Sequence, residues 1–381
     1  MQINKNLSKK DLLHRLLRMI LPMVMLSCFI IGASFVSIKP IGAQNRAEYA
    51  QATVDEVPVD NSSSQEFSGT QKVLATITSG KYSGEQCTLV NSNTYNRGAL
   101  CYPGTKIIAL IESDGGVLTG SVYNYDRTGM VYILLAIFAL AVILIGGKKG
   151  IAALYALIYT FICIICIYIP LIYVGTNGIL ASVISSIIIL VGSIYIINGW
   201  SGKTLCAIIG TMFGVVVSGL TALAAGIASN LSGFNMSDVE SMVYISDNTG
   251  VDVASLLYAG ILISSLGAVM DVSVSVVASM KEIYDKTPSL TSKELFASGM
   301  RVGRDMMGTM SNTLILAYTG SATGVLLTVY SYEMPYLQIM GYNSIIVELV
   351  CGLCGTLGVI LTVPIQAFVT SILLKTKIFQ K

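Results

Sequence analysis

The fold is decided by the stretch TGMVYILLAIFALAVILIGGKKGIAALYALIYTFICIICIYIPLIY (residues 128–173). It contains two apolar runs, 128–146 and 151–173, which are separated by a short turn rich in Gly and Lys. About 20 consecutive apolar residues are enough to cross the hydrocarbon core of a bilayer as a helix. The stretch therefore predicts two membrane-spanning helices joined by a tight turn.

Runs of the same kind recur along the chain, and only 12% of its 381 residues are charged. Soluble domains carry about 25% charged residues, so this composition is typical of a membrane protein. The predicted spans are 19–38, 128–146, 151–173, 178–198, 204–228, 254–280, 307–330 and 344–373. Their even number places both ends of the chain on the same side of the membrane.

The 23 Lys and Arg residues give the orientation, because all of them fall outside the predicted spans. With the N-terminus in the cytoplasm, the basic residues of the tails and short loops all lie inside, and the short outer loops hold none. The remaining seven belong to one long outer segment, to which the positive-inside rule does not apply. The sequence therefore predicts a multi-pass protein with both termini cytoplasmic.

Composition also excludes several classes of function. A net charge of +2 argues against nucleic acid as a partner, and the single His14 excludes a metal site or catalytic triad built from histidines. A phosphate-binding loop of the G-x-x-x-x-G-K-[ST] type is absent from the sequence. We therefore expect no cofactor and no bound metal.

Three domains are predicted. Residues 1–38 form a basic cytoplasmic tail and a first transmembrane anchor, for which a cleaved signal peptide is the alternative. Residues 39–127 contain alternating stretches at 72–78, 85–90, 106–111 and 117–123 between Gly-rich turns, which predicts a small extracytoplasmic β domain, a partly closed barrel. Residues 128–381 form a bundle of seven transmembrane helices.

Two cysteines, Cys87 and Cys101, lie in the β domain. An extracytoplasmic compartment is oxidising in many organisms, so they could form a disulfide or remain two free thiols.

One carboxylate lies well inside an apolar run. Asp271 is about ten residues from the inner end of run 254–280, or roughly 15 Å along a helix, near the middle of a bilayer. It shares a helix face with Gly260, Ser264, Gly267 and Ser275, and we expect this face to turn toward other helices rather than lipid. Because no Lys or Arg lies at its depth, we expect Asp271 to be protonated, to bind a cation or to face water.

The next run presents a second polar face. Thr309 and Asn312 lie on it, and Asn312 is either a ligand or an interhelical hydrogen-bond clamp. At the inner membrane edge, Arg304 and Asp305 form either an ion pair or a gate. Gly308, like Gly267, is expected to permit close approach of a neighbouring element.

Two further stripes of small residues predict close packing between helices. Their members are Gly210, Gly214, Ser218, Thr221 and Ala225 in one run, and Gly352, Gly355, Val359, Thr362 and Gln366 in the other.

Three strings carry a resemblance: SLGAVMDV (265–272), SGMRVGRD (298–305) and GTMSNTLILAY (308–318). They resemble the YibE/F-like family of bacterial membrane proteins. The resemblance implies a multi-pass permease of the bacterial cell membrane, with an unassigned substrate and no established catalytic residues. The family name joins two related proteins, which implies that a related family member could serve as a paired subunit.

The leading hypothesis is a secondary transporter of a small solute, coupled to protons or another cation. Asp271 would carry the ion, and Asn312, Ser264, Ser275 and Thr309 would line the path. The alternative is a membrane scaffold whose β domain binds a partner protein or the cell envelope. An intramembrane enzyme is not expected, because Asp271 has no second carboxylate at its depth.

Overall fold

The computed structural model describes Ser27 and residues 48–61, 69–93, 99–114, 117–231, 233 and 239–376. The predicted first span, 19–38, lies outside the described residues apart from Ser27. The chain divides into two compact units, one of which is Pro40–Ile145, while the other includes Gly146–Lys381.

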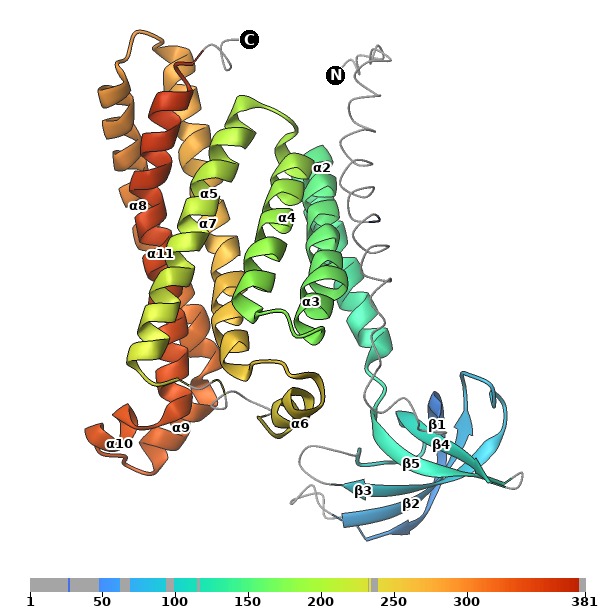
Figure 1. Cartoon of the computed structure of the whole chain (residues 1–381). Coiled ribbons are helices and arrows are strands. Elements are labelled where there is room, and N and C mark those ends of the chain that lie inside the picture. The colour runs from blue at the N-terminus through green and yellow to red at the C-terminus, as the bar shows by residue number, and fades with distance from the viewer. Residues whose placement is uncertain are drawn as a thin grey trace, which may run out of the picture. The chain divides into compact units, whose positions relative to one another are not determined.

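The first unit contains a five-stranded closed barrel (Figure 1). Its strands are β1 (Glu48–Asp60), β2 (Gly69–Ile77), β3 (Gln86–Asn93), β4 (Lys106–Asp114) and β5 (Val117–Tyr125). They follow one another around the barrel as β1-β2-β3-β5-β4, and only the β3–β5 pair is parallel. This is a Greek-key barrel of the OB type, closed rather than partly closed as predicted.

Alternate residues of each strand fill the barrel, as the period of two requires. On β2, for example, Val73, Ala75 and Ile77 are buried. Two buried amides also lie inside: Gln71 donates to the Cys101 carbonyl over 3.1 Å, and Asn91 donates to Gln71 over 2.8 Å. These bonds fix the segment before β4 to the barrel wall.

The two cysteines of the barrel are free thiols, so the disulfide considered from the sequence is not formed. Each thiol is directed to a different carbonyl: Cys87 donates to Ala75, and Cys101 donates to Ala99. Burial raises the pKa of both thiols, that of Cys101 to about 11 with a further contribution from Asp60.

Residues 128–173 form a helical stretch with one sharp break. It consists of α2 (Thr128–Cys163), a π-helical turn (Ile164–Tyr168) and α3 (Ile169–Tyr173). Gly147 has φ +53° and ψ −129°, which is not helical, and it lies in the turn predicted at 146–150. A straight helix of 46 residues would measure roughly 70 Å, more than twice the hydrocarbon core, and the break divides it into two lengths that each suit a bilayer.

The second unit is a helical bundle. Its long helices are α4 (Gly178–Asn198), α5 (Gly202–Ala228), α7 (Val253–Lys286), α8 (Ser292–Ser321) and α11 (Asn343–Leu373), which run side by side in Figure 1. The short helices α6 (Val239–Thr249), α9 (Thr323–Ser331) and α10 (Tyr336–Met340) lie at one end of the bundle.

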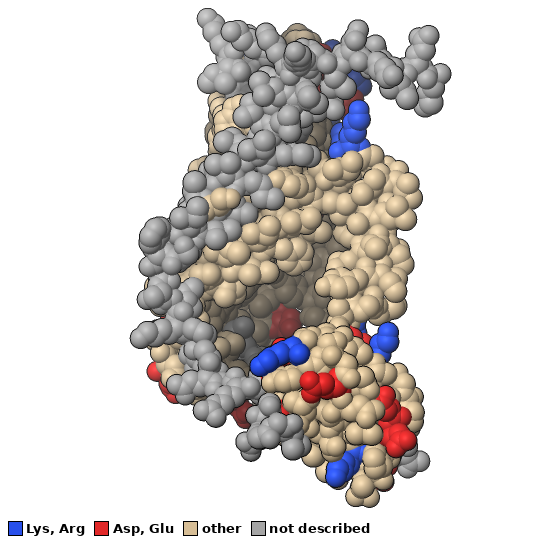
Figure 2. Space-filling model, turned by 90° about the vertical axis from the view of Figure 1, so that its right-hand side faces the viewer, with Lys and Arg blue, Asp and Glu red and all other residues tan. Residues whose placement is uncertain are grey.

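Five helical segments of the described chain are long and apolar enough to cross a membrane, or six if the bent α8–α9 pair is one span. One of the five is the broken stretch 128–173, which contains two predicted spans. Figure 2 shows how charge is distributed over one side of the molecule. Charged side chains gather on the barrel, and the helices are almost entirely uncharged, as expected for membrane-length apolar helices.

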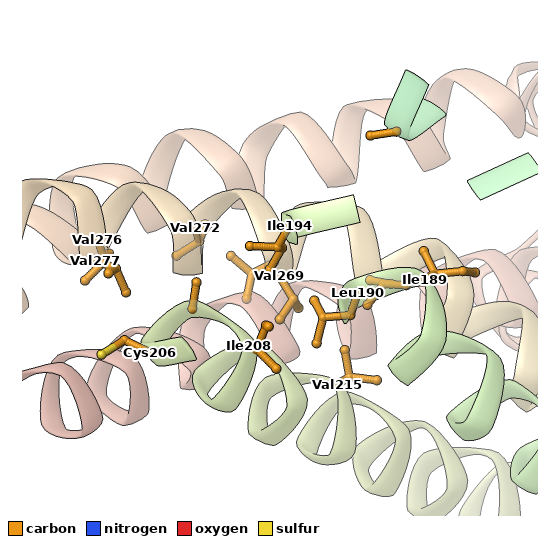
Figure 3. Packing of buried hydrophobic residues seen from close by; sticks show 14 of the residues in the cluster. Ile189, Leu190, Ile194, Cys206, Ile208, Val215, Val269, Val272, Val276 and Val277 are labelled. Atoms are coloured by element: carbon orange, nitrogen blue, oxygen red, sulfur yellow. The ribbon is translucent and has the colours of Figure 1, made fainter. Parts of the chain in front are cut away.

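The bundle core is aliphatic. Residues of α4, α5 and α7 interdigitate, with Leu190, Ile208 and Val269 among the buried side chains (Figure 3). The packing predicted for the small-residue stripes of α5 and α11 is confirmed, because a Cβ added at Gly210 would meet Gln366 and one added at Gly214 would meet Thr362. Gln366 is fully buried and donates to the Cys206 carbonyl on α5 over 3.0 Å.

Candidate functional site

Helix α7 has two contrasting faces. The face against the core carries branched aliphatic side chains that are almost completely buried: Leu262, Leu266, Val269, Val272 and Val276. The face predicted to turn inward is instead the open one, since Gly260, Ser264, Gly267 and Asp271 are all exposed and Ser275 is half-buried. The aliphatic face packs into the core that α7 forms with α4 and α5, so the face with Asp271 is the one left open.

Asp271 has no partner within the described part of the chain. It lies near the middle of α7, and no hydrogen bond or ion pair to it is formed there. The sequence contains no Lys or Arg between Lys203 and Lys281 or between Arg304 and Lys375. Asp271 therefore lies in a membrane-length helix with no Lys or Arg nearby along the sequence. A carboxylate at membrane depth needs a proton, a bound cation or water.

Helix α8 begins at a well-formed cap and packs mainly through its first half. Thr291 and Glu294 form a capping box, in which the Glu294 carboxylate accepts from the Thr291 backbone over 2.8 Å. The residues of α8 that are buried are Leu295, Gly299 and Gly303. A Cβ at Gly303 would collide with Val363 of α11, so this glycine permits close helix contact.

The pair Gly299 and Gly303 was not predicted as a packing site. Its spacing of four residues is the small-xxx-small pattern of close helix contacts, so the signal is present in the sequence.

The second half of α8 presents an open polar face. Gly308, Thr309 and Asn312 are exposed. The Thr309 hydroxyl donates to the Met306 carbonyl of its own helix over 2.9 Å, whereas Asn312 makes no hydrogen bond within the described residues. Among the described residues, Asn312 is therefore not an interhelical clamp.

Two expectations for this region are corrected by the structure. Ion pairs in the described chain link Lys281 with Asp285 and Lys286 with Glu282 over one helical turn, and none joins Arg304 to Asp305. Adjacent residues on a helix point in different directions, which accounts for this.

The second corrected expectation is that the glycines of the open faces, Gly267 and Gly308, lie close to a neighbouring element. A Cβ added at Gly267 or Gly308 would meet nothing within 4 Å, so neither glycine makes a close approach to another described residue.

One hydrogen bond joins the two open faces. The hydroxyls of Ser264 on α7 and Tyr318 on α8 lie 2.7 Å apart, and either can donate. Because α7 and α8 are antiparallel neighbours with the same rise per residue, this contact places Asp271 at the height of residues 308–312. The structure thus brings Asp271, Thr309 and Asn312 to one depth of the bundle.

A metal cluster is not formed at this depth. No group of three His, Cys, Asp or Glu side chains in the described ranges is placed to hold a metal ion. The chemistry available is that of one carboxylate with hydroxyl and amide neighbours, which can exchange a proton or solvate a single cation.

The strings SLGAVMDV and GTMSNTLILAY supply most of these groups, and comparison with known families gives them a context. A model of the YibE/F-like protein family matches residues 134–376. The chain belongs to this family. The match begins within α2 and covers the bundle, so the β barrel of this YibE/F-like protein lies outside it. No curated protein and no solved structure matches the chain.

Proposed function

We propose that this YibE/F-like protein is a permease of the bacterial cell membrane that couples movement of a small solute to a proton or another cation. The proposal rests on Asp271, an unpaired carboxylate near the middle of a membrane-length helix. It lies on an open face that continues onto α8 with Thr309 and Asn312. A membrane carboxylate of this kind typically marks an ion pathway or proton relay.

In this proposal the chain crosses the bilayer eight times and both termini are cytoplasmic. Asp271 takes up the ion and releases it on the other side. Ser264, Ser275, Thr309 and Asn312 solvate the ion along the path.

The open face is completed, in the same proposal, by a paired subunit from a related family member. Hydrocarbon offers no hydrogen bond to Asp271 or Asn312, so leaving this face against lipid would be costly. A Cβ at Gly267 or Gly308 would meet no described residue within 4 Å, which leaves room for a partner's helix to approach closely.

The test is ion flux in proteoliposomes that contain the full chain and a trapped pH-sensitive dye. Flux is driven by an imposed K⁺ or Na⁺ gradient, and Asp271→Asn is compared with Asp247→Asn. Asp247 is an exposed carboxylate on α6, so its substitution controls for loss of one negative charge. We expect Asp271→Asn to abolish proton-linked flux and Asp247→Asn to retain it; full flux in Asp271→Asn would end the proposal.

A scaffold is the second candidate, because the barrel carries an exposed aromatic pair. Tyr49 and Tyr123 are 60% and 48% exposed, and their rings pack edge to face at 5.3 Å. Exposed aromatic residues of this kind are enriched in binding surfaces. If exchange of residues 39–127 with another family member transfers function, the barrel is the active part and the bundle is an anchor.

We propose no catalytic role for the chain, because the proposed path holds a single carboxylate, whereas an intramembrane enzyme needs a nucleophile–base pair or paired carboxylates at one depth.

A further inference from the structure

A cavity of about 140 Å³ lies between α8, the start of α9 and the first half of α11. Most of its wall is aliphatic, formed by Ile315, Leu326, Ile345, Leu349 and Leu353. Three residues with polar side chains also line it: Tyr318, Thr319 and Glu348. Helices α8 and α9 are bent by 63° at Ala322, and Gly352 has no side chain, so space remains between the helices.

Glu348 gives this cavity a negative charge, and none of the residues that line the cavity is basic. The sequence has no Lys or Arg from residue 305 to 374. The Ser321 hydroxyl lies beside the carboxylate and can solvate it, but it carries no charge.

The neighbouring short helices and loops at this end of the bundle are also acidic, with Glu240, Asp247, Asp252 and Glu333. Their summed field raises the local concentration of cations.

The residues of the cavity wall favour an organic ammonium ion over a divalent metal ion. Calcium takes six to eight oxygen ligands and magnesium needs a near-octahedral shell, whereas this cavity offers one carboxylate and two hydroxyls. An ammonium group needs fewer partners, and an aliphatic chain attached to it is matched by the leucine and isoleucine walls. The Tyr318 ring adds a surface that attracts a positive charge.

We propose that this cavity binds a small alkylammonium ion, with its ammonium group on the Glu348 carboxylate and its alkyl chain against Ile345 and Leu349. The volume equals that of about four to five water molecules in the liquid, which suits a cation with only a few carbon atoms. The Tyr318 hydroxyl also bonds to Ser264, so the cavity adjoins the open face of α7. The binding step goes beyond the proposed function and does not require Asp271.

The test is calorimetric titration of n-butylammonium into the full chain in lipid nanodiscs, with empty nanodiscs subtracted. Butanol serves as the uncharged probe of the same length. Two variants change the cavity: Glu348→Gln removes the charge, and Gly352→Leu places a side chain in the space. A Cβ at Gly352 would lie 3.5 Å from Tyr318, an ordinary contact, so the first atom of a new side chain causes no clash there.

We expect the wild-type chain to bind n-butylammonium more tightly than butanol, and Glu348→Gln to weaken that binding by about 10- to 100-fold, the loss expected for a charged hydrogen bond. Gly352→Leu should also abolish binding, while Asp271→Asn should bind as the wild type does.

Equal binding by Glu348→Gln and wild type, or no binding by wild-type protein that unfolds cooperatively, would overturn the proposal. Loss of transport in Asp271→Asn with binding intact would separate this site from the proposed ion path.

Discussion

Substitution of two glycines by alanine should have opposite consequences. Gly303 on α8 is buried and its added Cβ would collide with the Val363 side chain, whereas Gly267 on α7 faces open space. Both positions lie inside helices, so the gain in helix propensity on replacing Gly by Ala, about 1 kcal/mol, is common to the two variants. The difference between them therefore isolates the packing.

The size of that difference follows from the collision. Forcing one extra methyl into a filled interior costs about 1–3 kcal/mol. We expect Gly303→Ala to be less stable than Gly267→Ala by this amount, measured as the free energy of unfolding during titration of mixed micelles with SDS. Equal stability of the two variants would refute the packing described for α8 and α11.

The same pair of variants reports on a paired subunit. If a partner covers the α7 face, Gly267→Ala should not lower the stability of the isolated chain, because its added Cβ meets no described residue, but it should weaken co-purification with that partner. Unchanged co-purification, also for the larger Gly267→Leu, would show that the partner does not pack on this glycine.

Three other predictions concern the barrel and the junction with α2. Hydrogen bonds from Thr128 lower the pKa of Asp126. The ionised carboxylate should therefore stabilise the fold at neutral pH, and this contribution should disappear as the pH falls through the lowered pKa. When melting temperature is plotted against pH, Asp126→Asn should flatten the acidic part of the curve. Burial raises the pKa of the Cys101 thiol to about 11, so the folded barrel keeps the thiol proton at a pH at which the unfolded chain has lost it. The stability of the barrel should therefore fall between about pH 9 and pH 11. This fall should be smaller in Cys101→Ala. The buried thiols Cys87 and Cys101 should react with a disulfide reagent at pH 8 only in denaturant, and rapid reaction of the folded protein would contradict their burial.

The elements that follow from local chemistry could be predicted from the sequence. The apolar runs mark the long helices, the turn at Gly147 falls between two of them, and Thr291 with Glu294 marks the start of α8. The stripe with Gly210 and Gly214 correctly predicted close helix contact, because small residues recur there at helical spacing, and the structure shows that the contacting helix is α11.

Features that depend on direction could not be predicted. The spacing of Gly260, Ser264, Gly267 and Asp271 correctly identified one helix face, but it does not say whether that face is covered. In this chain the opposite aliphatic face fills the core. Whether the stripe is open to water, lipid or another subunit is a tertiary or quaternary property that a single helix pattern does not contain.

The barrel shows the same limit. Strand β1 was not predicted, because two of its inward residues, Ala50 and Ala52, give a weak alternation of hydrophobicity. Cys87 and Cys101 are both buried, but sequence separation carries no information on the direction of a Cβ, and a disulfide requires that direction to be right.

The proposed ion path requires water to reach position 271 in the folded protein within a membrane. This can be measured with Asp271→Cys in a background that lacks the eight native cysteines, using a charged, membrane-impermeant thiol reagent on proteoliposomes. A thiol introduced at the buried position Val272 is the matched control, one residue along the same helix. The proposed ion path predicts rapid modification at position 271 and none at position 272. Reaction at position 271 only with a lipid-soluble reagent would contradict a water-accessible path.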